Sequence, residues 1–132
     1  MAKSRQSKVR QSKVTVGQFL TSGRDRLNLE LVSGARGLER VIVEPVTHRP
    51  GLALSGFFGH FARKHIQVVG MAEHAYLSSL PEALRVQRFE KLFAHKIPCM
   101  VFTRGKRVFP EVLRVSERDG VAVLRSGMVT RF

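Results

Sequence analysis

The chain has little of several features that would define a function, and each scarcity excludes a class of protein. Its 132 residues include one cysteine, Cys99, so neither an internal disulfide framework nor a cysteine-based zinc finger can form. The longest apolar runs are about as long as a β-strand, which is too short to cross a bilayer. The first residues lack the apolar centre of a secretory signal. We therefore expect a cytoplasmic protein that does not enter a membrane.

Signatures of catalysis are equally scarce. The sequence contains neither a Gly-x-Ser-x-Gly nucleophile elbow nor a Gly-x-x-x-x-Gly-Lys-Ser/Thr phosphate-binding loop. Its five histidines include no pair spaced i, i+4 on an expected helix and no neighbouring cysteine ligand, so no metal site is predicted. Cys99 lies in an apolar stretch, which is typical of a core residue rather than a nucleophile. We expect neither catalysis nor a bound cofactor from this chain alone.

Acidic residues are outnumbered, with 10 Asp and Glu against 23 Lys and Arg, and the formal net charge is +13. The first 14 residues hold five of these cations and no acid, and the pentapeptide Arg-Gln-Ser-Lys-Val occurs at 5–9 and again at 10–14. We predict that residues 1–13 form a disordered basic arm. The arm is either a solvated tail or an electrostatic handle for nucleic acid or another acidic surface. The tail is favoured because no aromatic residue is available to stack on bases.

Periodicity places the folded part at residues 14–132. Thr15 is predicted to cap a short helix with one apolar face. Alternating apolar residues at 27–32 and an apolar stretch at 38–43 predict two strands, separated by a turn at 33–37. The chain is therefore expected to open with a β-rich unit.

The second half has a different sequence pattern, in which three short apolar stretches alternate with helical sequence. The stretches predict buried strands at residues 66–69, 99–102 and 121–124. A helix is predicted to begin at a capping box formed by Ser79 and Glu82, with Pro81 in its first turn. A second helix is predicted from 111 to 119, ending at Gly120. Such alternation favours βαβ crossovers, so we predict one α/β domain: a β-rich N-terminal unit followed by a small parallel-sheet layer.

Ligands of parallel sheets usually bind beyond the carboxyl ends of the strands. Three such ends carry a glycine here, and two of them add an arginine, which suits a phosphate or a carboxylate. The candidate ligand-binding residues are Arg49, Gly51, Gly70, Thr103, Arg104, Gly105 and Arg125. The alternative is that the glycines only make turns and the arginines only face solvent, since no glycine-rich phosphate fingerprint follows any of these strands.

Three cations recur every three residues on the expected helix after Pro81, at Arg85, Arg88 and Lys91. We predict that this stripe is a solvated face, accompanied by the partly opposing Glu82 and Glu90.

Residues 47–58 form the most distinctive segment. Pro50 and Gly51 force a turn, and the small residues Ser55 and Gly56 would allow a short helix to approach another element closely. Residues 49–58 resemble the Arg-Pro-Gly-Leu-x-Leu-x-Gly-Phe/Tyr-Phe stretch of the N-terminal domain of HPr kinase/phosphorylases.

The same resemblance continues in order along the chain. It is carried by residues 37–40, by 66–70 with the following Glu73, by the run at 76–80 and by Pro-Cys-Met-Val-Phe-Thr-Arg-Gly at 98–105. It covers about residues 14–132. It implies a fold similar to that of the UDP-sugar-binding domain of the Mur ligases.

The resemblance also implies a non-catalytic regulatory or assembly role. Whole members of the family are bacterial cytosolic hexamers that use ATP and Mg²⁺ to phosphorylate a serine of the phosphocarrier HPr. They reverse the reaction with inorganic phosphate, and so link the sugar phosphotransferase system to carbon catabolite repression. ATP, Mg²⁺ and HPr bind the family's C-terminal kinase domain, so the expected partners of this chain are that domain and other subunits.

The interdomain candidates implied by the resemblance are Thr130, Arg131 and Phe132. A different class of function stays open from the residues alone: a free-standing module that uses the basic arm to bind an anion or nucleic acid.

Overall fold

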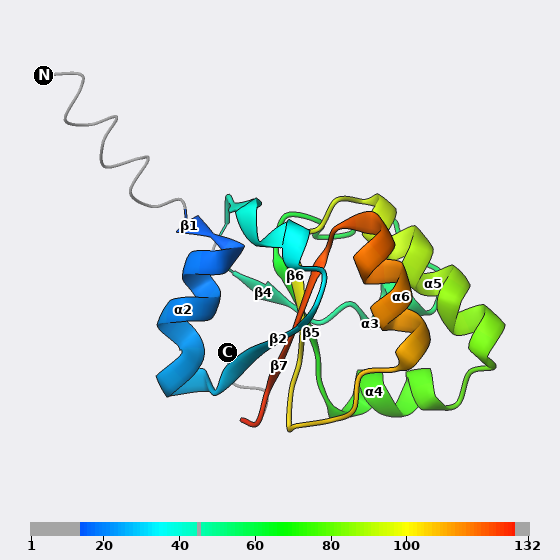
Figure 1. Cartoon of the computed structure of the whole chain (residues 1–132). Helices are drawn as coiled ribbons and strands as arrows, with labels where there is room; N and C mark the ends of the chain where they lie inside the picture. Colours follow the sequence, from blue (N-terminus) through cyan, green and yellow to red (C-terminus); the bar gives the residue numbers. More distant parts are fainter. Residues whose placement is uncertain (1–13, 45, 129–132) are drawn as a thin grey trace, which may run out of the picture.

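The computed structural model describes residues 14–44 and 46–128, which form a twisted sheet with helices on both faces (Figure 1). The sheet has five strands in the order β2-β7-β6-β5-β4. The pairs β4–β5, β5–β6 and β6–β7 are parallel, and β2 is antiparallel to β7. The predicted α/β class with a parallel sheet is therefore confirmed.

The bounds of the elements follow the chain. The sheet contains β2 (Leu29–Ser33), β4 (Thr47–His48), β5 (Ile66–Val69), β6 (Cys99–Phe102) and β7 (Ala122–Ser126). A separate antiparallel pair is formed by β1 (Val14–Thr15) and β3 (Val41–Ile42). The helices are α2 (Val16–Leu27), the 3₁₀ helix η1 (Ala35–Glu39), α3 (Gly51–Leu54), α4 (Met71–Ser78), α5 (Glu82–Ala94) and α6 (Pro110–Asp119). None of these helices is both long and apolar enough to cross a membrane.

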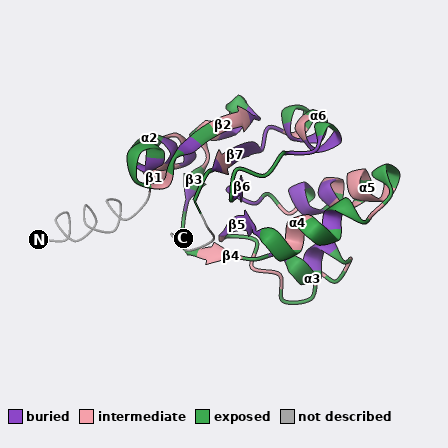
Figure 2. Ribbon diagram, turned by 90° about the horizontal axis from the view of Figure 1, so that it is seen from below, coloured by how far each residue is buried: buried purple, intermediate pink, exposed green. Residues whose placement is uncertain are grey.

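The sheet separates two cores, because successive side chains of a strand point to opposite faces. In β6, Met100 and Phe102 pack with residues of α3, α4, α5 and α6, while Cys99 and Val101 pack with α2, β2 and β3. Figure 2 shows the buried residues gathered in β5, β6 and β7 and on the inner faces of the helices. The three central strands are therefore buried on both sides, as continuous apolar runs in parallel sheets usually are.

Helix α2 confirms the predicted cap and exceeds the predicted length. The Thr15 hydroxyl accepts from the N–H of Gln18, and the Gln18 side chain accepts from the N–H of Thr15, which makes a capping box. The helix continues for 12 residues to Leu27 and ends at Asn28, which has a left-handed backbone conformation. The expected strand at 27–32 is therefore wrong at its start, and β2 begins two residues later.

The strand expected at 38–43 is also wrong for its first half. Residues 35–39 form η1, and only Val41 and Ile42 are paired in a strand. The reason is a close contact that the sequence does not show: a Cβ on Gly34 would lie 1.9 Å from the Val121 carbonyl oxygen, in a backbone with φ of +75°. The turn is packed against the start of β7, and only glycine fits there.

In the second half the strands at 66–69 and 99–102 and the end of α6 are confirmed, and the strand expected at 121–124 is found at 122–126. The capping box at Ser79 is wrong. Ser79 closes α4 instead, because its hydroxyl donates to the Tyr76 carbonyl at 2.6 Å. Pro81 precedes α5 rather than lying in its first turn. Gly120 ends α6 with a φ of +67°, as predicted.

The prediction of a solvated stripe on α5 holds for the exposed Lys91 but is wrong for Arg85 and Arg88, which are partly buried. Nε and an Nη of Arg85 both lie 2.6 Å from Oε1 of the buried Glu111 in α6, and its guanidinium lies over the Phe109 ring. Arg85 also donates to the carbonyl oxygens of Leu77 and Leu80 at the end of α4. It therefore joins three helices. Glu82 and Glu90 pair with arginines of α6, not with the stripe.

Candidate functional site: the groove between α3 and α4

A small apolar groove lies between α3 and α4, with a volume of about 170 Å³. It is lined by Gly51, Leu54, Ser55, Ala72, Glu73 and Tyr76. These residues come from two segments, one after β4 and one after β5, and both segments carry the resemblance noted above. Because β4 and β5 are neighbouring parallel strands, the fold brings the residues after them to the same edge of the sheet.

The first wall of the groove is the turn that Pro50 and Gly51 open. Helix α3 has four residues, and the Leu54 N–H donates to the Pro50 carbonyl at 2.9 Å. The chain then turns at Gly56, whose φ is +105° and where a Cβ would lie 2.3 Å from a guanidinium nitrogen of Arg88 in α5. This confirms that the small residues allow a close approach, and it identifies α5 as the element approached.

The second wall is the first turn of α4, which Glu73 organises. One oxygen of Glu73, Oε1, accepts from the Gly70 N–H and from Arg49 Nε, both at 2.8 Å. The carboxylate thereby satisfies an otherwise unpaired N–H at the start of the helix and complements the helix dipole. Arg49, Gly51 and Gly70, which are three separate candidates in the sequence, are thus gathered at one place.

Exposed apolar side chains lie on the segments that form the groove. Leu52 in α3 is 68% exposed, and Tyr76 in α4 and Phe57 after α3 are also exposed. Large apolar side chains in water next to an apolar hollow are typical of a surface that contacts another molecule. Sequence reasoning missed Leu52, Ala72 and Tyr76 as site residues, although the resemblance at 49–58 and 76–80 contained two of them.

The remaining ligand-binding candidates lie at the ends of β6 and β7, where the chain itself uses many of their donors. The N–H groups of Arg104 and Gly105 donate to the carbonyl oxygens of Met128 and Ser126. The Thr103 hydroxyl donates to the Val69 carbonyl at 3.1 Å, and the Arg125 guanidinium pairs with Glu30 at 3.0 Å. Anion binding at this end stays a prediction, and among these residues it would depend on the Arg104 side chain.

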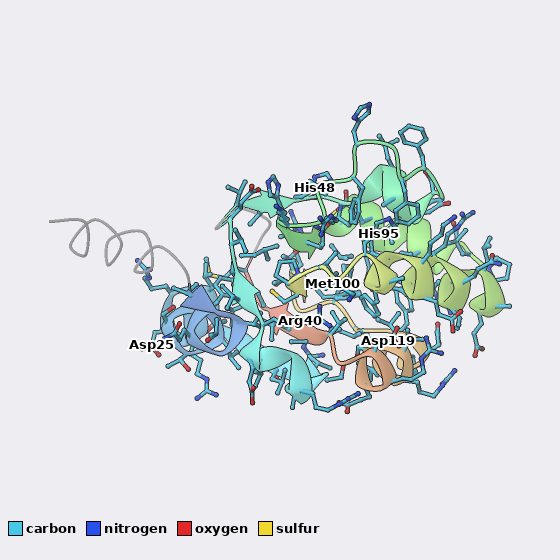
Figure 3. All side chains as sticks on the ribbon, turned by 90° about the horizontal axis from the view of Figure 1, so that it is seen from above. Asp25, Arg40, His48, His95, Met100 and Asp119 are labelled. Carbon is cyan, nitrogen blue, oxygen red and sulfur yellow. The ribbon has the colours of Figure 1, made fainter. Side chains whose placement is uncertain are left out.

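A second cluster of titratable groups surrounds the loop between α3 and β5. The His95 ring stacks on Phe58 at 4.6 Å between ring centroids, and Phe61 packs edge-on against both His95 and His48. Figure 3 labels His48 and His95, which lie on the same side of the molecule. Burial, and in addition the proximity of His65, lowers the pKa of His48. The cluster holds a loop by aromatic packing.

Other reactive groups have structural surroundings. Cys99 is fully buried, which raises the pKa of its thiol to about 12, as expected of a core residue. Within residues 14–44 and 46–128, no three histidine, cysteine or carboxylate side chains lie close enough together to hold a metal ion. The interdomain candidates Thr130, Arg131 and Phe132 and the basic arm at 1–13 lie outside the described residues.

Comparison with known proteins gives a consistent result. Residues 14–131 match the family model described as "HPr Serine kinase N terminus". The chain is 36% identical over 119 residues to an HPr kinase/phosphorylase of Halalkalibacterium halodurans, covering 90% of this chain and 37% of that protein. It is 34% identical over 106 residues to the protein of the same name from Bacillus subtilis, covering 80% of this chain and 34% of the relative. The chain thus spans little more than a third of the length of these relatives.

A solved structure supports the fold. The regulatory region of a Clostridium perfringens pyrophosphatase, with its CBS and DRTGG domains and bound diadenosine tetraphosphate, superposes with a TM-score of 0.53 at 17% sequence identity. The match covers 84% of this chain and 42% of that one. At this level of identity the likeness concerns the fold alone.

Proposed function

Because the chain belongs to the HPr serine kinase N-terminus family, we propose that it is the non-catalytic regulatory and assembly domain of a bifunctional HPr kinase/phosphorylase. The observation that carries the proposal is the family match over residues 14–131, nearly the whole chain. The whole protein would phosphorylate a serine of HPr with ATP. In the reverse direction it would transfer that phosphoryl group from the serine to inorganic phosphate. Through that reaction it would act on the sugar phosphotransferase system and carbon catabolite repression.

The groove between α3 and α4 is the part of this domain that we assign to the regulatory contact. Its volume of about 170 Å³ is below the roughly 300–1,000 Å³ of pockets that enclose small-molecule ligands. A hollow of this size accommodates one side chain of a protein surface more readily than a nucleotide or a sugar. The exposed Leu52 and Tyr76 around it favour the same interpretation. We therefore propose that another subunit or the kinase portion contacts the groove.

The catalytic part of the proposal is tested by phosphotransfer. The 132-residue chain, mixed with HPr, ATP and Mg²⁺, is expected to transfer no phosphate above background, whereas a longer protein that carries it with a kinase portion is expected to be active. Radiolabelled phosphate on HPr measures both. Transfer by the 132-residue chain alone would show that the domain is itself an enzyme and that the proposal is wrong.

The regulatory part is tested by filling the groove. Ala72→Phe in the longer protein places a ring into the hollow from an exposed position of α4, so the fold should be retained. We expect an altered subunit assembly or an altered ratio of kinase to phosphorylase activity, measured by light scattering and by HPr phosphorylation and dephosphorylation.

Ala83→Phe is the matched control, since Ala83 is also exposed and is also the second residue of its helix, α5. It should behave as the parent protein. If Ala72→Phe left both assembly and the activity ratio unchanged, the groove would have no regulatory role.

The relatives favour this function over a free-standing module that binds anions or nucleic acid.

A further inference from the structure

Three connections of the chain converge at the carboxyl edge of the sheet, beyond the first turn of α4 that forms one wall of the groove. They are the turn from β5 into α4, the loop from β6 to α6, and the segment that leaves β7, all at the lower edge of Figure 1. The loop at 103–109 lies between the other two. It is joined to α4 because Nε2 of His74 lies 2.9 Å from the Arg107 carbonyl oxygen.

Four hydrogen bonds fix the direction in which the chain leaves β7. The N–H of Arg104 donates to the Met128 carbonyl at 2.8 Å, and that of Gly105 donates to the Ser126 carbonyl at 2.7 Å. The Met128 N–H donates to the Ser126 hydroxyl, which donates in turn to the Leu27 carbonyl at the end of α2. The exit is thus attached to the β6–α6 loop and to α2, so whatever follows β7 begins at a defined place.

The loop beside this exit presents three cations. Arg104, Lys106 and Arg107 are exposed, and the part of the chain that the structure describes offers none of them an ion pair. Two acids of the elements at this edge are engaged elsewhere: Glu73 is bonded to Arg49 and to the Gly70 N–H, and Glu30 pairs with Arg125. An excess of exposed positive charge at a fixed exit favours a negatively charged neighbour.

Two exposed methionines lie on the two segments that are hydrogen-bonded to this loop, α4 and the exit from β7. Met71 opens α4 directly after β5, and Met128 lies on the exit itself. Flexible apolar side chains beside unpaired charges are typical of protein interfaces that contain both apolar and polar contacts.

We infer that the exposed residues 104–107, with Met71 and Met128, are the docking surface for an acidic face of the polypeptide that follows this domain. The inference rests on the proposed function, because that function supplies a following kinase portion. It adds which surface of this domain meets that portion and which charge the partner carries. The groove between α3 and α4 then remains available for a different contact.

Hydrogen exchange tests the docking in the longer protein. The peptide at 103–109 should exchange at least about tenfold more slowly there than in the 132-residue chain, because docking suppresses the local opening that exchange requires. Raising the ionic strength should reduce the difference, since screening weakens exposed charge pairs. Equal exchange in the two proteins would overturn the inference.

Charge reversal supplies the matched comparison. Lys106→Glu/Arg107→Glu should abolish the slowing, whereas Arg63→Glu/Lys64→Glu should preserve it. Arg63 and Lys64 are also adjacent, exposed and in a loop, but they precede β5 and so lie at the opposite edge of the sheet. Unchanged exchange in α5 shows that each variant is folded. Equal loss in both variants would assign the effect to net charge and overturn the docking surface.

Three further outcomes distinguish a docking surface from a small-anion site and from a failure of the proposed function. Slowing of the 103–109 peptide by inorganic phosphate in the 132-residue chain, without slowing in the longer protein, would make the loop a small-anion site and overturn the inference. Slowing in the longer protein without phosphotransfer to HPr would support the docking surface and overturn the proposed catalytic context. Phosphotransfer to HPr with equal exchange in the two proteins would support the proposed catalytic context and overturn the docking surface.

Discussion

Two of the arginine–glutamate pairs that tie neighbouring elements together differ mainly in burial. Arg85 and Glu111 are 14% and 5% exposed, and their closest atoms are 2.6 Å apart between α5 and α6. Arg49 and Glu73 are 45% and 10% exposed, and their closest atoms are 2.8 Å apart between the end of β4 and α4. The distances are nearly equal, so the surroundings decide what each pair does.

The buried pair is saturated by the chain itself. Arg85 is also hydrogen-bonded to two carbonyl oxygens and packed on Phe109, which leaves little of its guanidinium for another molecule. The other arginine makes one ion pair at the rim of a groove and keeps nearly half of its side chain in water. The comparison teaches that the first pair fixes the helical layer, whereas the second keeps a charge accessible beside a candidate contact surface.

The largest effect should follow from breaking the buried pair. Glu111→Ala leaves the Arg85 charge in a mostly buried position without its carboxylate, and such a change costs about 3–5 kcal/mol of unfolding free energy. Urea denaturation of the 132-residue chain, followed by circular dichroism, measures the loss.

The double variant Arg85→Met/Glu111→Leu sharpens this test. It removes both charges and fills similar volume with apolar side chains, so it should recover most of the lost free energy. A double variant as unstable as Glu111→Ala would show that the unpaired Arg85 charge does not account for the loss in Glu111→Ala.

A smaller effect is expected at the exposed pair, and its two members should differ. Glu73→Ala removes the acceptor of the Gly70 N–H at the start of α4 and should cost about 1 kcal/mol, as loss of a helix cap does. Arg49→Ala removes only a partly exposed ion pair and should cost about 0–1 kcal/mol.

Thermal unfolding of the two single variants beside the parent chain measures this difference. Glu73→Gln is the control, because its side-chain oxygen still accepts from the Gly70 N–H while its charge is lost. If Arg49→Ala destabilised the chain as strongly as Glu111→Ala, the exposed pair would be structural and the contrast between the two pairs would be wrong.

The sequence predicted the parts of the fold that depend on local periodicity. The three central strands are short, mostly apolar segments of four or five residues. Phe89, Leu92 and Phe93 recur at helical spacing in α5 and are buried together. Gly120 at the end of α6 follows from backbone freedom at a left-handed turn. Each of these signals is contained within a short run of consecutive residues.

The parts that sequence reasoning missed depend on contacts between distant residues. Helical spacing alone made Arg85 a surface cation, but Glu111 lies 26 positions later and only the packing of α5 on α6 brings the two together. The 3₁₀ helix at 35–39 likewise depends on Gly34 meeting Val121. The groove was missed for the same reason, because its walls come from segments that only the pairing of β4 with β5 makes adjacent.

The contact between His48 and His65 extends the comparison from opposite charges to like charges, which repel when both are protonated. Its effect on the free energy of unfolding should be the smallest of those predicted. The rings of His48 and His65 lie 6.3 Å apart, and burial followed by repulsion from His65 lowers the pKa of His48 below its ordinary value of 6.5. The unfolded chain therefore binds a proton at His48 more readily than the folded chain. The stabilisation that neutral His48 provides is fully present above pH 6.5, falls as the pH drops from 6.5 toward the lower folded pKa, and levels off below it.

Urea denaturation across this pH range should show a shallow decline in the free energy of unfolding, and His48→Gln should flatten that decline. The exposed loop variant His60→Asn, which suits the positive φ at that position, should retain the decline. A decline that persists unchanged in His48→Gln would assign the pH dependence to other groups. It would also show that repulsion between His48 and His65 does not affect stability.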